Sequence, residues 1–549
     1  MNPREITDIK VLQDLVIELL NRVDQLTIAH MSLQEQLAEA KDEINRLKGE
    51  QGRPRFPKRR KSPKLKAKRR GSKPAQKDSA SDESATPPAT DACVSVDLPP
   101  ANLPADAVFK GYRSVYQHDI KLARHNTEYK IARWYSPAQG KVYESSLPPG
   151  AVAGIGSSLR SFIQILHHGG DMTHRKIGEL LDHLGIELSS GAISELLTRS
   201  DWVEAEYEAL LQTSLGESPY VQMDSTASRQ QGKGMHTQVM CGEFFSLFST
   251  QQGRSRADVY AALQGQSREE VQLAYTPLAI ELMEQAKVSK KHRAYFAQQF
   301  DLGVVFSFEL LEQHLNTATV FAKTNQGRRS VIAGALAAGY YHQQQVVPKV
   351  NYLLTDDARE YDKIAAEAHL HCWIHAIRPY RKMSPTQAYL RDIHQAFLDR
   401  LWLFYDQLRI YQKPPPDTQP KSKAELIRQF DQLFVPHSDY QHLNKQISLT
   451  LDKRAYLLEC LDYPAIPLHN NAAERAARRV VRKRNISLHT WSKRGTRMRD
   501  AFMSLHQTAK KLGLKFLDYL KERNAGIIPE KTIAQLVQQR YRNAATTTF

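Results

Sequence analysis

The sequence predicts a multidomain protein of mixed α/β class, and three observations support this prediction. Helical heptads occupy the first 50 residues, and short apolar runs of strand length lie at 220–248 and 350–355. Long stretches between and after these runs have helical periodicity. With 549 residues, the chain is long enough for roughly three to four domains.

The positive charge of the chain is concentrated near its N-terminal end. The formal net charge is +17, and about a dozen Lys and Arg fall between residues 51 and 77 without an acidic residue. Such a charge excess predicts a polyanionic partner. Residues 51–105 have Phe56 as their only aromatic and too few apolar residues for a core, so we expect a disordered basic linker.

The basic half of this linker is expected to bind a nucleic-acid backbone electrostatically, without reading sequence. A linker that serves only solubility is the alternative. The residues expected to contact phosphates are Lys58, Arg59 and Arg60.

The four cysteines, Cys93, Cys241, Cys372 and Cys460, lie far apart and form no C-x-x-C pair. This pattern, without a signal peptide ahead of it, favours a reducing cytoplasm and gives no support to a four-cysteine zinc module. No apolar run approaches the ~20 residues that span a bilayer, so we expect no association with a membrane.

Residues 1–50 are predicted to form a coiled-coil segment. Apolar residues alternate at spacings of four and three for about five heptads. Val16 and Val23 fall at a positions and Leu19 and Leu26 at d positions, a combination that favours a parallel two-stranded assembly. We therefore expect a homo-oligomer, with an amphipathic helix docked on its own domain as the alternative.

Two further segments precede the predicted sheet. Residues 106–150 have short apolar and aromatic runs broken by Pro and Gly, which predict a small β-containing module. Residues 151–215 are helical in pattern, with a glycine turn and then a second helix that begins at Ser189 or Ser190 as N-cap. This outline is typical of a helix-turn-helix that binds DNA, with Arg199 near its reading face, and equally of a plain helical hairpin.

Asp224 ends a short apolar run, Tyr220–Asp224, and two further strand candidates follow at His236–Met240 and Phe244–Phe248. A ribonuclease-H-like sheet presents its first metal ligand in this way, as an aspartate at the mouth of a first strand with a β-meander behind it. An aspartate that only caps a turn is the alternative.

A second apolar run, Val350–Thr355, also ends in acids, Asp356 and Asp357. Only one of two neighbours points at a given site, and we choose Asp356 because it directly follows the predicted strand. Cys372 and His375 come next, with C-x-x-H spacing. Two ligands without a second pair favour a packed Cys and His that brace the site over a structural zinc.

Glu474 is a single carboxylate inside an arginine-rich helical stretch, and Asn470 and Asn471 precede it. Cations flank it within roughly two or three turns, an arrangement suited to a metal site beside DNA. An exposed helix in which Glu474 pairs with Arg478 is the alternative. The candidate DNA-binding residues that follow Glu474 are Arg475, Arg478, Arg482, Lys483 and Arg484.

Three ordered blocks of the sequence resemble the DDE transposases of the IS66 family. They are Met223–Thr226, Leu354–Tyr361 followed by Cys372–His375, and Asn470–Ala476. The resemblance implies a catalytic domain with a ribonuclease-H-like core, followed by a C-terminal helical region. The bounds that we expect are 216–500 for the catalytic domain, with helical insertions near 255–345 and 384–458, and 501–549 for the C-terminal region.

The sequence departs from the family pattern in three respects. It lacks the cysteine zinc module that members often carry ahead of the catalytic domain, and His469 stands where the family has an aspartate. The first two acids are also 132 positions apart (356 minus 224), which is more than a minimal ribonuclease-H core needs. These departures bear on the subgroup more than on the chemistry.

The resemblance implies that Asp224, Asp356 and Glu474 are catalytic ligands of two Mg²⁺ or Mn²⁺ ions. One ion would activate water and later the freed 3′-hydroxyl, and the other would stabilise the leaving oxygen. Arg475, Arg478 and Arg482 would grip phosphates, since arginine pairs with them bidentately. The implied partners are double-stranded DNA, at the ends of an insertion sequence and in the target, and accessory transposition proteins; the implied location is the bacterial cytoplasm.

Two other functions share these features. A metal-dependent nuclease of the same fold would use the same acids without strand transfer. A repurposed, non-catalytic DNA-binding protein would keep the coiled coil, the basic arm and the helix pair. The intact acids in all three blocks argue against this last function.

Overall fold

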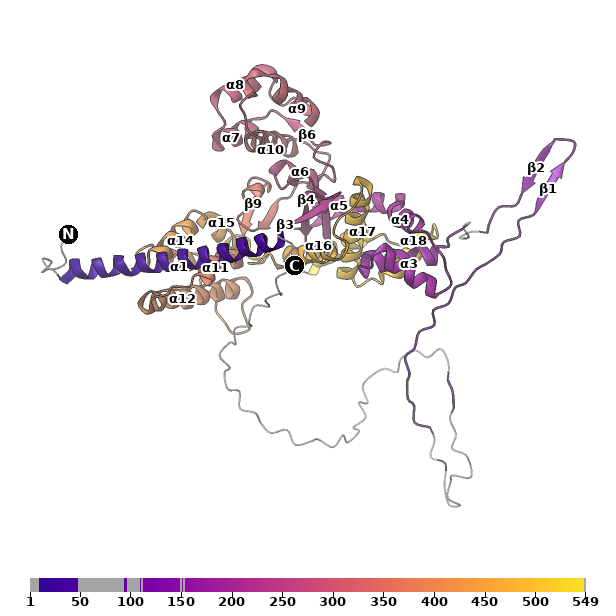
Figure 1. Ribbon diagram of the computed structural model, residues 1–549, viewed down its shortest axis with the longest axis horizontal. Helices are drawn as coiled ribbons and strands as arrows, with labels where there is room; N and C mark the ends of the chain where they lie inside the picture. The colour runs from indigo at the N-terminus through magenta and orange to yellow at the C-terminus, as the bar shows by residue number, and fades with distance from the viewer. Residues whose placement is uncertain are drawn as a thin grey trace. The chain divides into compact units, whose positions relative to one another are not determined.

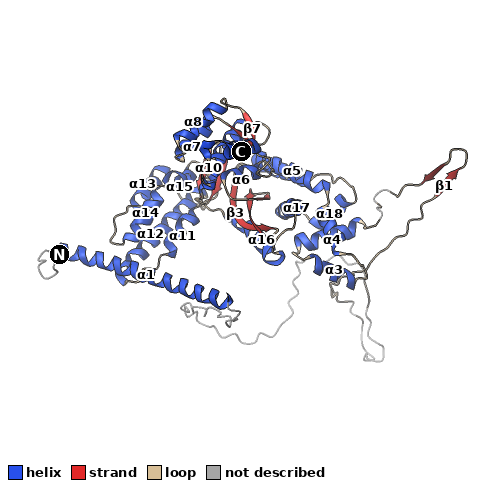
Figure 2. Cartoon of the chain, turned by 45° about the horizontal axis from the view of Figure 1, so that its top comes forward, coloured by secondary structure: helices blue, strands red, loops and turns tan. Residues whose placement is uncertain are grey.

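The structure, a computed structural model, describes residues 9–47, 93–95, 109, 112–148, 151 and 154–547. Residues 1–31 and 126–549 belong to one unit, and residues 32–125 to another. The mixed α/β class that the sequence predicts is confirmed, since a five-stranded sheet is combined with many helices (Figures 1 and 2). Among the described helices, none is long and apolar enough to cross a membrane.

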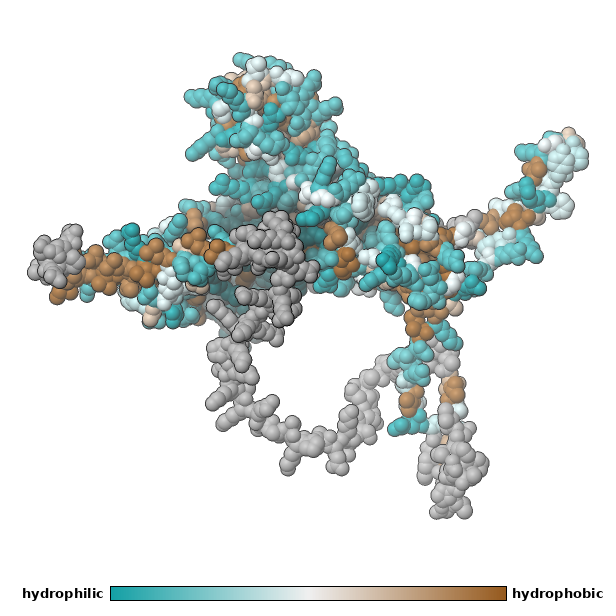
Figure 3. All heavy atoms as spheres, viewed as in Figure 1, coloured by the Kyte–Doolittle hydropathy of each residue, from teal (hydrophilic) through white to brown (hydrophobic). Residues whose placement is uncertain are grey.

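The chain begins with the long helix α1, Ile9–Leu47. Its heptad leucines are exposed, as Leu19 (54%) and Leu26 (64%) illustrate, and Figure 3 shows hydrophobic atoms gathered along this helix. The polar residues Asn21 and Asp24 are buried instead, with 2% and 1% exposed. The helix therefore packs its polar face, with Asn21 and Asp24, against its own unit. Its apolar seam, which includes Leu19 and Leu26, stays exposed.

Among the described residues, two strands and four α-helices lie between α1 and the main sheet. Strands β1 (Arg133–Ser136) and β2 (Lys141–Glu144) form a hairpin, within the segment where the sequence predicts β structure. Helices α3 and α4 are joined through Gly185, which has a φ of +70°, and Ser189 caps α4 with its side chain, as predicted. The four helices are α2 (Ser157–Gln164), which continues into the π-turn η3 (Ile165–Gly169), α3 (His174–His183), α4 (Ser190–Thr198) and α5 (Asp201–Glu217).

The central sheet has the strand order β5-β4-β3-β8-β9. Strands β3, β4 and β5 form the antiparallel meander that the sequence predicts, whereas β8 and β9 run parallel to β3. The β3–β4 hairpin turns through Gln231 and Gly232, both at positive φ (+49° and +76°), as a type I′ turn requires. The bounds are β3 (Val221–Gln230), β4 (Lys233–Cys241), β5 (Ser246–Gln251), β8 (Tyr352–Thr355) and β9 (Ala368–His371).

Helical segments lie between β5 and β8 and again after β9. Between β5 and β8, the described residues form five α-helices, one short 3-10 helix and a small two-stranded sheet that the sequence did not indicate. These elements are α6 (Arg256–Leu263), β6 (Gln272–Ala274), α7 (Pro277–Gln285), α8 (Lys290–Gln299), β7 (Val305–Ser307), α9 (Phe308–Thr317), η4 (Thr319–Phe321) and α10 (Gln326–Gln343).

After β9, a second group of helices packs around the buried Trp373, whose indole N–H donates to the Leu457 carbonyl at 3.0 Å. These elements are α11 (Trp373–Lys382), α12 (Ala388–Gln412), α13 (Lys423–Leu433), α14 (Gln441–Leu451), α15 (Arg454–Leu458) and η6 (Glu459–Leu461); the short η5 (Arg359–Tyr361) lies between β8 and β9.

Four C-terminal helices complete the unit: α16 (Asn471–Ser487), α17 (Lys493–Leu512), α18 (Phe516–Asn524) and α19 (Ile533–Thr547). Figures 1 and 2 both place α16 and α17 beside the sheet. Helix α17 is joined to β5 by buried hydrogen bonds, from the Phe248 amide to Ser504 (2.9 Å) and from the Ser246 amide to Thr508 (3.1 Å). The sheet and these helices pack in more than one hydrophobic cluster: α16 packs against Val239 and Phe248, and most of the buried residues of α17 pack in the larger cluster with Met223 and Leu247.

Candidate functional site

Asp224 and Asp356 lie on the two adjacent central strands. Strand β3 pairs in parallel with β8, with Val221 opposite Leu353 and Gln222 opposite Leu354. Two residues further along, the same register brings Asp224 on β3 opposite Asp356, which directly follows β8. Neighbouring strands are about 4.8 Å apart, so the two carboxylates share one edge of the sheet.

Glu474 is the third acid, and two hydrogen bonds fix its helix beside β3. The buried side-chain amide of Asn470 donates to the Met223 carbonyl at 2.6 Å, and the Ala472 amide donates to Gln222 Oε1 at 3.2 Å. Glu474 follows in the first turn of α16, where the helix dipole favours a negative charge. Asn470 therefore positions the third acid next to the strand that carries the first.

Helix α11 provides the next layer of contacts. Cys372, buried just before α11, accepts a hydrogen bond from the Asn470 amide at 3.2 Å. Three residues later, His375 places Nε2 3.4 Å from Glu474 Oε1, and Arg378 Nη2 lies 3.2 Å from the same oxygen. Cys372 and His375 thus contact Asn470 and Glu474, the residues at the start of α16.

The three acids are close enough to influence one another electrostatically. Burial raises the pKa of Asp224, and repulsion from Asp356 and Glu474 raises it further, to about 6, against the opposing charge of Arg378. Burial also raises the pKa of Asp356. Among the described residues, no three His, Cys, Asp or Glu side chains are arranged so that they could hold a metal ion. Glu474 is engaged by cationic partners in this conformation.

Asp357 is directed to a different partner. Its carboxylate forms an ion pair with Lys453 at the start of α15. Burial alone would raise the pKa of Asp357, but the hydrogen bond and charge of Lys453 lower it overall. Asp357 thus belongs to a surface ion pair, in keeping with the choice of Asp356 for the site.

The arginines of α16 fall on two sides of the helix. Arg475, Arg478 and Arg482 are exposed, and Arg478 Nη2 is 3.8 Å from Glu474 Oε2, the i,i+4 pair that the sequence left as an alternative. Arg484 is half-buried and donates to the Ala227 carbonyl on β3. The exposed side therefore carries three of the five predicted cations.

Lys483 requires a correction. It was expected to contact DNA, but its side chain is only 6% exposed, and its ammonium donates to the His167 carbonyl at 2.5 Å. Arg479, also on this side, binds the carbonyls of His168 and Gly169 at 3.0 Å each and the Asp171 carboxylate at 2.5 Å. Lys483 and Arg479 join α16 to the helical region before the sheet and have no exposed face for DNA.

The remaining predicted cations lie elsewhere. Arg199 is exposed just after α4 and pairs with Glu195. Lys58, Arg59 and Arg60 lie outside the described residues.

Two residues near the acids were not assigned from the sequence. Arg378 contacts Glu474, and its only signal is the i,i+3 spacing from His375 on a helix. Tyr361 is buried with its hydroxyl 3.3 Å from Gln238 Oε1; burial, and then the charges of Asp224 and Asp356, raise its pKa well above the ordinary value. The sequence places Tyr361 at the end of the block Leu354–Tyr361 that resembles the IS66 family, but it assigns the residue no role.

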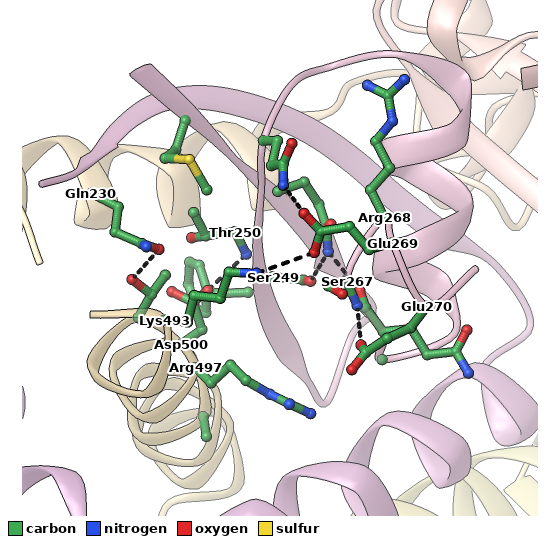
Figure 4. Close-up of a pocket in the computed structure, with 18 of the residues that line it drawn as sticks. Gln230, Ser249, Thr250, Ser267, Arg268, Glu269, Glu270, Lys493, Arg497 and Asp500 are labelled. Atoms are coloured by element: carbon green, nitrogen blue, oxygen red, sulfur yellow. Dashed lines mark hydrogen bonds and ion pairs between the residues drawn. The ribbon is translucent and has the colours of Figure 1, made fainter. Parts of the chain in front are cut away.

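A hollow of about 860 Å³ lies apart from these acids, between β5, the 265–270 loop and the start of α17 (Figure 4). Two of its charged side chains, Lys493 and Asp500, have partners of their own. Lys493 lies 3.3 Å from Glu269, and Asp500 accepts from the Thr250 amide at 2.7 Å. None of the three predicted acids lines it.

Comparison with known proteins matches residues 310–498 to the model of the transposase IS66 family. This range contains Asp356 and Glu474, together with the C-x-x-H block, and it ends within α17. The chain is also 29% identical over 317 residues to the uncharacterized protein y4jO of Sinorhizobium fredii (strain NBRC 101917 / NGR234). That alignment covers 57% of this chain and 94% of the relative. Residues 310–498 of this chain are thus similar to the IS66 transposase family, which supports the resemblance at the second and third sequence blocks; the first block, Met223–Thr226, lies outside the matched range.

Proposed function

We propose that this protein cuts DNA at the ends of an insertion sequence and joins the freed ends to target DNA, with divalent metal ions at Asp224, Asp356 and Glu474. The observation that carries this proposal is the proximity of the three acids: Asp356 and Glu474 are near enough to raise the pKa of Asp224, although the three side chains are not arranged to hold a metal ion in this conformation. The strand register brings the first two together, and the Asn470 hydrogen bond brings Glu474 beside them. Their mutual repulsion contributes to the raised pKa of Asp224.

The donor set fits Mg²⁺ or Mn²⁺. Carboxylate oxygens are the ligands that these hard cations prefer, and a bound cation would relieve the repulsion that Asp224 experiences. When bound, two such ions supply an activated water or 3′-hydroxyl and stabilise the leaving oxygen. Glu474 would have to exchange its contacts with Arg378 and His375 for the metal, since it is paired with them here.

The chain's own cations would orient the DNA. Arg475, Arg478 and Arg482 follow one another at spacings of three and four on α16, so they share a face of the helix. All three are exposed, and guanidinium groups can hold phosphates bidentately. This face would fix the phosphate backbone so that the scissile phosphate meets the acids.

The strand order supports a ribonuclease-H-like core for this domain. An antiparallel meander is followed by two strands parallel to its first strand, and the acids stand on β3, after β8 and on a later helix. Insertions between β5 and β8 account for the 132 positions between Asp224 and Asp356 without disturbing the register.

Two further elements would serve assembly and recognition. We infer that the uncovered apolar seam of α1 pairs with α1 of a second copy, because exposed leucines at heptad positions are typical of a coiled coil. We also infer that α3 and α4 form a helix-turn-helix in contact with DNA, with Arg199 beside α4. Both inferences extend the functions expected of a transposase.

The decisive experiment is strand transfer with purified full-length protein. The assay contains Mg²⁺ or Mn²⁺ and labelled DNA with the ends of the element that flanks this gene. Glu474→Ala serves as the inactive variant, and Asp357→Asn, outside the site, as the matched control. Joined product with wild type and Asp357→Asn, lost in Glu474→Ala, would support the proposal.

Two outcomes would contradict it. Cleavage without joining favours a metal-dependent nuclease, because both reactions use the same acids. DNA binding with neither reaction favours a repurposed DNA-binding protein. In that case Glu474→Ala would bind DNA as the wild type does.

A further inference from the structure

The connection between α16 and α17, residues 488–492, presents large apolar side chains to solvent. Trp491 is 75% exposed and Leu488 is 65% exposed. Such side chains carry a cost in water, and Leu488 in addition adopts a φ of +59°, which is rare for a residue with a Cβ. A strained backbone conformation at an exposed apolar residue suggests that this connection has a role in binding a ligand.

The connection is held rigidly against the β3–β4 hairpin. The Gln231 amide donates to the Thr490 carbonyl at 2.8 Å, and the Thr490 amide donates to the Arg229 carbonyl at 3.2 Å. The Gln231 side chain donates to the Trp491 carbonyl at 2.7 Å. These hydrogen bonds to the β3–β4 hairpin therefore fix the position of the backbone at Trp491.

A pocket of about 800 Å³ opens beside this connection, and we call it the junction pocket. Arg229, Arg484, Leu488 and His489 are among its lining residues, and no described lining residue is acidic. Ser228 also lines it; this side chain is 2% exposed, and its hydroxyl has no hydrogen-bond partner among the described residues. Nε2 of His489 is likewise buried and unpartnered there.

We propose that the junction pocket receives an unpaired nucleotide of the bound DNA, with Trp491 stacking on its base and Leu488 wedged against the neighbouring pair. The proposal rests on the proposed function in taking DNA as the ligand. Aromatic side chains stack on unpaired bases, and apolar side chains enter between base steps. Arg229 and Arg484, which both line the pocket, match a phosphate of the same nucleotide.

The pocket lies within reach of DNA held at the acids. Leu488 follows Glu474 by 14 residues along α16 (488 minus 474), which corresponds to about 21 Å at 1.5 Å per residue. Stacked DNA rises by about 3.4 Å per nucleotide, so the pocket would meet a base about six positions from the scissile phosphate. It would therefore hold DNA locally opened beside the cleavage point.

The test measures binding of full-length protein to two labelled duplexes in EDTA, so that no cleavage occurs. One duplex is fully paired, and the other contains three mismatched pairs with 2-aminopurine at the centre. We expect tighter binding of the mismatched duplex, and quenching of 2-aminopurine as its base stacks on the ring. Trp491→Ala should abolish the quenching and weaken binding of the mismatched duplex about tenfold, since stacking contributes roughly 1–3 kcal/mol per base.

Three comparisons make the result specific. Trp491→Phe should retain much of the quenching, and Trp491→Ala should bind the fully paired duplex as wild type does. Leu403→Ala removes an equally exposed leucine (64%) on α12 and is the matched control for Leu488→Ala. It should change neither the binding of the two duplexes nor the quenching of 2-aminopurine. Leu488→Ala should weaken only the mismatched duplex.

Equal binding of both duplexes by wild type and Trp491→Ala would overturn the proposal. So would a change in sedimentation of Trp491→Ala with unchanged DNA binding, because the apolar surface would then join two copies of the chain. Strand transfer is a separate measurement, so its failure would contradict the proposed function while the quenching result still tests the pocket.

Discussion

Asp224 lies on β3, and Asp356 directly follows the neighbouring parallel strand β8. The pairs Val221–Leu353 and Gln222–Leu354 both differ by 132 in number, and Asp224 and Asp356 differ by the same amount (356 minus 224). The separation that looked excessive for a minimal core is thus the offset of the β3–β8 register. The segment between β3 and β8 contains β4, β5 and the inserted helices, and it does not change the pairing of β3 with β8.

This register predicts opposite results at two adjacent aspartates. Asp356→Asn should reduce strand transfer by roughly a hundredfold or more, because metal ligation contributes several kcal/mol to transition-state stabilisation. Asp357→Asn should leave the rate within about threefold, since Asp357 pairs with Lys453 at the surface. Rates at saturating Mn²⁺ measure both, and a larger loss in Asp357→Asn would show that the wrong neighbour was assigned.

Arg378 should compete with metal for Glu474, because its guanidinium lies 3.2 Å from Glu474 Oε1. Arg378→Gln should lower the Kd for Mn²⁺ about fivefold, which is about 1 kcal/mol. Calorimetric titration without DNA is the measurement. Arg478→Gln, at 3.8 Å and 74% exposed, is the matched control and should shift the Kd less. Weaker Mn²⁺ binding in Arg378→Gln would mean that Arg378 organises the site instead.

Asn470 should be required for both stability and activity. Asn470→Ala leaves the Met223 carbonyl without its 2.6 Å donor in a buried position, which costs about 1–3 kcal/mol of unfolding free energy. Asn471→Ala, whose side chain has no hydrogen bond among the described contacts, should cost under about 0.5 kcal/mol. Urea unfolding compares the two, and equal losses would contradict the positioning role of Asn470.

His168 should make the protein less stable in mild acid. Burial, and then the nearby charges of His167 and Lys483, lower the pKa of His168 well below its ordinary 6.5. Below pH 6.5 the unfolded chain therefore binds a proton that the folded chain does not, so stability falls as the pH falls. The slope is about 1.4 kcal/mol per pH unit for this one residue.

His168→Phe should reduce that slope while it keeps the ring stacked on Phe502, whose centroid lies 4.1 Å away. Unfolding free energies at pH 7.0, 6.0 and 5.0 provide the comparison. An unchanged pH dependence in His168→Phe would assign the acid sensitivity to other groups.

The apolar seam of α1 should control self-association independently of folding. Leu19→Asp combined with Leu26→Asp places charges on exposed heptad positions, so the sedimentation coefficient should fall to that of a monomer. The thermal midpoint at low protein concentration should stay within about 2 °C. An unchanged sedimentation profile would remove the coiled coil from the proposal.

The other face of α1 provides the control for this experiment. Asn21 donates to the Asp439 carbonyl at 2.6 Å and accepts from the Gln441 amide at 2.9 Å. Asn21→Ala should loosen the helix from its unit, which limited proteolysis would detect, without dissociating the oligomer.

The sequence by itself determined the features that depend on neighbours along the chain. Heptad spacing predicted α1, and the serine pair 189–190 predicted the start of α4. Apolar runs that end in an acid predicted β8 and the first part of β3, which continues past Asp224 to Gln230. Periodicity and capping act within a few residues, so they are visible without any knowledge of the fold.

Only the tertiary structure decided which side chains meet. Arg378 and Glu474 are 96 positions apart, yet they lie 3.2 Å apart because α11 and α16 meet at the same edge of the sheet. Lys483 looked like its exposed arginine neighbours, but α16 turns it onto the His167 carbonyl. Such contacts depend on how helices pack across the core, and the local pattern of charges on a helix does not specify which face becomes buried.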